Sequence, residues 1–153
     1  MKGMMAFYQL FPVIWLRETR TATVFGRDSS LPDDSYGFIG LYCVDPACDC
    51  RRVMINVLAE KQRTHLATIN HAFEPPADDD PVQEQTFLDP LNVQSRWSGA
   101  LLGVFKEILL DEAYRERLDR HYRMVKDALR DPAHPIHQVI SGSRRPQEPC
   151  RKP

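Results

Sequence analysis

Residues 36–60, YGFIGLYCVDPACDCRRVMINVLAE, decide the fold that the sequence predicts. In the first part, 36–44, aromatic side chains alternate with smaller apolar ones at the two-residue period of a β-strand. The last part, 52–60, places its aliphatic residues on one side with the same period. Pro46 separates the two patterns, because proline lacks a backbone donor and restricts the residue before it. The stretch therefore predicts two antiparallel strands that reverse direction at a cysteine-rich turn.

This turn, the knuckle (residues 43–50), carries three of the chain's four cysteines at the spacing C-x4-C-x-C. Zinc is bound by thiolates and imidazoles brought within bonding distance, and a short turn between paired strands can supply them. We therefore predict a zinc ion as the cofactor, with Cys43, Cys48 and Cys50 as ligands. The carboxylates of Asp45 and Asp49 are expected to orient the turn by hydrogen bonding to the backbone.

A closed tetrahedral zinc site needs a fourth ligand. A strand from residue 52 runs away from the knuckle, and the next strand returns to it. His65 is then at the far end, roughly 25–30 Å from the cysteines at the usual strand rise, whereas His71 is near the return end. We therefore expect His71 to be the fourth ligand. Four other residues are alternatives for the fourth ligand: His121, His134, His137 and Cys150.

Other functions of the knuckle are also compatible with the sequence. With only three protein ligands, an open zinc could support metal-dependent hydrolysis, with Asp49 or Glu74 as the base. Cys48 and Cys50 could instead carry out thiol redox chemistry, and the cysteines could simply be buried or form a transient disulfide. The interpretation that we favour is a non-catalytic zinc-binding module with a structural metal that recognises a protein partner.

The rest of the chain predicts an α+β fold. Residues 4–16 and 20–25 are rich in β-branched and aromatic types and favour strands. Residues 66–73 favour the third strand of a β-meander, and residues 74–92 favour an irregular segment over the surface. Ser95 is a plausible N-cap for a helix over 96–110, and Asp111 for a second helix to about Arg130. We expect one domain over 1–142, with the two longer helices packed on the sheet, and a flexible tail over 143–153.

Composition narrows the classes of partner. The chain of 153 residues has 20 basic and 21 acidic side chains, a net charge of −1, so nothing global favours nucleic acid. The second helix interleaves Lys126 and five arginines with acidic residues, which is typical of an exposed, ion-paired face. No apolar run reaches the roughly 20 residues of a membrane-spanning helix. Because Gln9 and Pro12 interrupt the apolar start, we expect no signal peptide and a cytoplasmic protein.

Three further pieces accompany the knuckle: residues 66–70 (LATIN), residues 87–92 (FLDPLN) and the pair His121-Tyr122. Together with Tyr42-Cys43, Asp45-Pro46 and residues 48–53 (CDCRRV), they resemble a signature of uncharacterised prokaryotic proteins, over most of residues 31–140. Members of this group often end in a SEC-C zinc motif, of which Glu148-Pro149-Cys150 matches only the opening. The resemblance implies that the knuckle is a defining feature and implies no activity.

Overall fold

The computed structural model describes residues 3–26 and 30–143 and confirms the α+β class. Its antiparallel sheet contains β1 (Met4–Ala6), β2 (Arg20–Val24), β3 (Asp34–Cys43), β4 (Arg52–Ala59), β5 (Thr64–Ala72) and β6 (Thr86–Leu88). The strand order is β1-β3-β4-β5-β6, and β2 also pairs with β3. The helices are α1 (Phe7–Leu10), α2 (Pro12–Glu18), α3 (Ser98–Val104), the π-helix η1 (Phe105–Leu109), α4 (Glu112–Arg130) and α5 (Ile136–Gly142).

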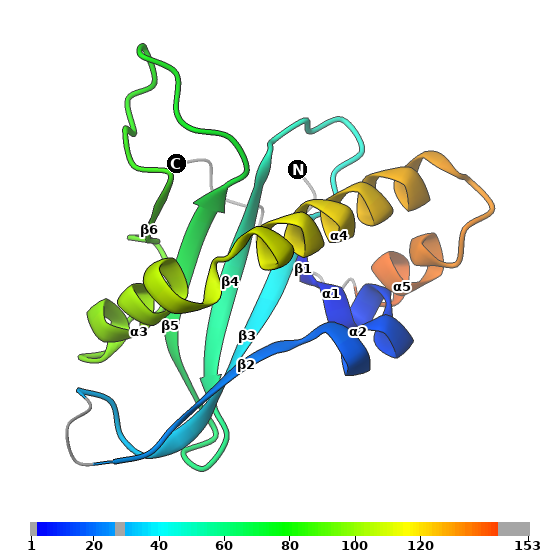
Figure 1. Ribbon diagram of the computed structural model, residues 1–153. Coiled ribbons are helices and arrows are strands. Elements are labelled where there is room, and N and C mark those ends of the chain that lie inside the picture. The colour runs from blue at the N-terminus through cyan, green and yellow to red at the C-terminus, as the bar shows by residue number, and fades with distance from the viewer. Residues whose placement is uncertain (1–2, 27–29, 144–153) are drawn as a thin grey trace.

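The helices α3, η1 and α4 run across one face of the sheet, while α1, α2 and α5 gather at its β1 end (Figure 1). Alternate residues of β3 and β4 point into this helix layer and form the core with it. Tyr42, fully buried, donates a hydrogen bond of 3.2 Å to the Leu118 carbonyl of α4. Side chains alternate along a strand. The residues next to Tyr42 in β3 therefore point to the face of the sheet opposite the helices.

The N-terminal segment corrects one prediction, because residues 7–18 form α1 and α2 and not a strand. Pro12 occupies the first position of α2, where the fixed backbone angle of proline suits a helix and its missing donor costs nothing. The side chain of Gln9 accepts a hydrogen bond from the Ala6 backbone at 3.3 Å, which closes the start of α1. The aromatic richness of this segment reflects packing, since Phe7 stacks on His121 with ring centroids 3.9 Å apart.

Two further boundaries differ from the prediction. The segment 74–92, expected to be irregular, contains β6, which extends the sheet beyond β5. The first C-terminal helix begins at Ser98, because the Ser98 hydroxyl donates to the Leu66 carbonyl at 3.0 Å and anchors the helix start to the sheet. That helix ends in the π-turn η1, where the Leu110 N–H donates to the Phe105 carbonyl at 2.9 Å.

The second helix follows the prediction closely. The Asp111 carboxylate accepts a hydrogen bond of 2.8 Å from the Tyr114 N–H, so Asp111 is the N-cap of α4, which ends at Arg130. Of the helices in residues 3–26 and 30–143, none combines the length and apolar character needed to cross a bilayer.

Candidate metal centre

The knuckle connects the end of β3 to the start of β4, as the sequence predicts. Its backbone reverses in a tight turn, in which the Asp45 side chain accepts from the Ala47 N–H at 2.9 Å and the Asp45 carbonyl accepts from the Cys48 N–H at 3.1 Å. Asp45 therefore orients the turn. Asp49 is exposed, and no hydrogen bond of its side chain is present among residues 3–26 and 30–143.

The turn brings together the thiol cluster (Cys43, Cys48 and Cys50), whose three sulfur atoms all lie within 4.8 Å of one another. All three cysteines are free; Cys43 is buried and the other two are half-buried. A Zn–S bond of about 2.3 Å in a tetrahedral site places neighbouring sulfurs about 3.8 Å apart. Small rotations of these side chains would therefore bring the thiol cluster to bonding distance from one ion.

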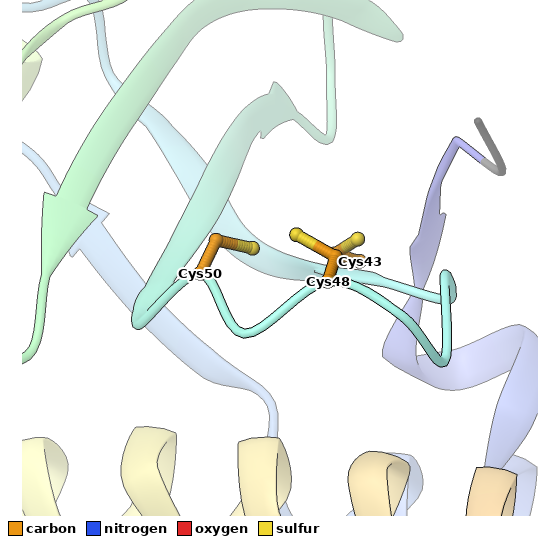
Figure 2. A group of neighbouring side chains, drawn as sticks. All are labelled: Cys43, Cys48 and Cys50. Carbon is orange, nitrogen blue, oxygen red and sulfur yellow. The ribbon is translucent and has the colours of Figure 1, made fainter.

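The thiol cluster lies on the side of the knuckle that faces away from α4. Cys43 follows Tyr42 on β3, so its side chain points to the face of the sheet opposite the helices. Figure 2 shows the three side chains pointing toward one another above the loop, with the turns of the helix on the other side. The metal-binding groups thus converge outside the helix-packed core.

Lys126 of α4 contacts the knuckle from the helix side. Its Nζ donates to three backbone carbonyls, those of Cys43 at 3.1 Å, Asp45 at 3.3 Å and Cys48 at 3.0 Å. All three N–H bonds of the ammonium group are thereby used. The residue is only 8 % exposed, so its assignment to an exposed helix face was wrong. The overlooked signal was its spacing, because Lys126 follows the buried Tyr122 by one helical turn.

Arg51 fixes the other end of the knuckle. Its guanidinium lies between two rings, 5.1 Å from the centroid of Phe73 and 5.0 Å from that of Tyr122. It also pairs with Glu74 at 2.6 Å and with Asp119 of α4 at 2.9 Å. Its charge is therefore shared with these carboxylates, and its main role is to hold the knuckle between β5 and α4.

The protons of the thiol cluster are coupled. A hydrogen bond from the Cys50 thiol lowers the pKa of Cys43 to about 5, aided by the Asp45 N–H and the charge of Lys126 and opposed by burial. The same hydrogen bond to Cys43, together with burial, raises the pKa of Cys50. At neutral pH one thiolate therefore forms readily and stabilises the remaining protons, which a bound cation would displace.

A comparison of the chain with protein-family models gives no match. Searches of curated proteins and of solved structures give no match either.

The structure does not bring His71 into the thiol cluster. His71 pairs with Val53 across β4 and β5, and both side chains point into the helix layer, whereas Cys43 points to the opposite face. Its Nδ1 lies 2.8 Å from the Thr86 hydroxyl, and its ring packs against Phe105. The direction of the strands predicted correctly that His71 lies at the end of β5 near the knuckle. It did not predict the face of the sheet to which the His71 side chain points.

The other candidate ligands lie elsewhere or outside the described residues. His121 stacks on Phe7, the His134 Nδ1 accepts from the Ile136 N–H at 3.0 Å, and the His137 Nε2 lies 2.9 Å from the Asp131 carbonyl. Cys150 lies outside the part of the chain that the structure describes. Within residues 3–26 and 30–143, no histidine or carboxylate joins the thiol cluster as a fourth ligand.

The two buried histidines predict acid sensitivity. Burial lowers the pKa of His71 to about 4, with Arg115 and Arg52 adding to the effect. Burial also lowers the pKa of His121 to about 4, although the nearby Glu18 carboxylate opposes the shift. In the unfolded chain the histidine pKa is about 6.5. Between these values the unfolded state binds more protons, so this contribution to stability is complete above pH 6.5 and decreases as the pH falls toward 4.

We expect the free energy of unfolding to fall by about 1.4 kcal/mol per pH unit for each histidine within this window. Urea denaturation at pH 7, 6 and 5 measures this change in the free energy of unfolding with pH. These values lie above the pH range in which most carboxylates titrate. His121→Phe should remove about half of it, because phenylalanine retains the stack on Phe7 and does not titrate. Equal stability at pH 7 and pH 5 would contradict the prediction.

Proposed function

We propose that this protein binds one zinc ion through the thiolates of Cys43, Cys48 and Cys50. The observation that supports the proposal is the convergence of three sulfur atoms within 4.8 Å in a loop of eight residues. Thiolates are soft ligands that favour zinc over the oxygen-preferring cations magnesium and calcium. The free thiols also suit a reducing compartment, which is the basis for placing the protein in the cytoplasm.

The role proposed for the metal is structural. Cys43 ends β3 and Cys50 immediately precedes β4, so an ion shared by them closes the loop between the two central strands. Lys126 and Arg51 already hold the loop from the helix side. An ion on the opposite side would complete the restraint and reduce the freedom of the loop.

The proposed mode of action is binding of a protein partner. The tip of the knuckle exposes Pro46, Ala47 and Asp49 next to the thiol cluster. A loop held rigid before binding loses little conformational entropy when a partner docks on it. A zinc-stapled tip of this kind therefore suits recognition.

Elemental analysis with thiol counting tests the proposal. We expect one zinc per chain in protein purified without chelator, with three thiols that react with a thiol reagent only after a chelator removes the metal. This result would also exclude redox chemistry at the same cysteines. Metal-free protein whose thiols all react freely would overturn the proposal.

A further inference from the structure

A second site lies on the helix face of the sheet, in the pocket where β5 meets the first half of α4. This pocket has a volume of about 280 Å³. It is lined by Arg51, His71, Phe73, Arg115, Glu116 and Asp119. It shares no residue with the thiol cluster, so its function can be tested separately from metal binding.

His71 provides the floor of this pocket. The residue is only 2 % exposed, and Thr86 and the rings of Phe73 and Phe105 hold its imidazole in one orientation. The Thr86 hydroxyl is hydrogen-bonded to Nδ1, whereas Nε2 makes no hydrogen bond to any residue in 3–26 or 30–143. Because His71 lines the pocket, this nitrogen is free to bond a group that enters it.

The charges around the pocket are not equally available. Arg51 pairs with Glu74 and Asp119, and Asp119 also pairs with Arg123 at 3.3 Å, so these four side chains neutralise one another. Arg115 forms no ion pair within the part of the chain that the structure describes. Its guanidinium is therefore the cation of the lining that remains available to a ligand.

The His71 imidazole at the floor of the pocket resists a proton chiefly because it is buried, and the positive charges of Arg115 and Arg52 add to this effect. A negatively charged group above the ring would be attracted by both of these cations.

We infer that this pocket binds the oxyanion group of a small ligand, a phosphate or a carboxylate, between His71 Nε2 and the Arg115 guanidinium. Arginine forms two parallel hydrogen bonds with such groups, and a neutral imidazole whose Nδ1 accepts from Thr86 has an N–H at Nε2 to donate a third. Phe73 supplies an apolar wall for the remainder of the ligand.

NMR titration of the full chain as purified tests the inference. Inorganic phosphate and acetate are added separately at constant ionic strength and pH 7, and the imidazole nitrogens of His71 are followed in a long-range ¹H–¹⁵N spectrum. We expect a saturable shift of Nε2 with at least one of the two anions. The anion with the lower Kd is the one that the site prefers.

Two variants on the exposed side of α4 complete the test without altering the core. Arg115→Gln is expected to weaken binding at least tenfold, because it removes a charge-assisted pair of hydrogen bonds. Arg130→Gln removes the same charge from a residue that neither lines the pocket nor pairs with its lining, and should leave the Kd within about twofold. Absence of a saturable shift with either anion would overturn the inference, as would an unchanged Kd in Arg115→Gln.

Discussion

Cys50→Ser is expected to purify without zinc and to melt at a temperature about 10 °C below that of the parent chain. A ligand present at about 1,000 times its Kd stabilises the native state by about 4 kcal/mol. In a chain of this size each kcal/mol shifts the Tm by about 2–4 °C. Because serine offers no thiolate, the two remaining sulfurs cannot hold the ion, and this stabilisation is lost.

Differential scanning calorimetry combined with elemental analysis measures both effects. The parent chain treated with a chelator should melt at the same temperature as Cys50→Ser, since both lack the ion. Ala47→Ser is the matched control, because it places a serine at an exposed position of the knuckle and keeps all three thiols, and we expect it to retain zinc and the parent Tm. Parental melting and zinc content in Cys50→Ser would refute the structural metal.

Lys126→Met is expected to lower the free energy of unfolding by about 2–4 kcal/mol, the range for removing a buried hydrogen-bonding group whose partners stay unpaired. Methionine fills the space of the aliphatic stem but leaves three carbonyls of the knuckle without the Lys126 donor. It also removes the cation that favours the Cys43 thiolate. Zinc affinity should therefore fall about tenfold along with stability.

The matched control for this variant is Lys106→Met, which places methionine at an exposed lysine of η1 far from the knuckle in sequence. Urea denaturation and competition with a chromogenic zinc chelator measure stability and affinity in both variants. We expect Lys106→Met to remain within about 0.5 kcal/mol of the parent chain. If Lys126→Met matched it in both measurements, the carbonyl contacts of Lys126 would not contribute to the site.

Short-range patterns in the sequence predicted the central features correctly. The alternation in β3 and β4 requires only that neighbouring side chains point to opposite faces, and Pro46 marks the turn between them. The cap at Asp111 depends on one carboxylate and an N–H three residues later. The convergence of the thiol cluster follows from the same tight turn.

Predictions that depended on composition were less successful. Residues 7–18 are aromatic and β-branched, yet they form α1 and α2, whose Phe7 and Leu10 are buried in the hydrophobic core. The strand β6 is short and pairs with β5 from a segment whose prolines and acidic residues favoured a loop. In both cases a partner distant in the sequence decided the local structure.

By itself, the sequence determined the strand pair, the turn between its strands and the three thiols that the turn collects, because these arise from contacts within a few residues. Only the tertiary structure decided that Lys126, 83 residues after Cys43, lies beneath the knuckle and bonds its carbonyls. It also decided that His71 faces the helices, away from the thiol cluster, and lines a pocket of its own. The reason is that pairing register and helix packing, which sequence spacing does not specify, determine the face to which a side chain points and the group that it meets.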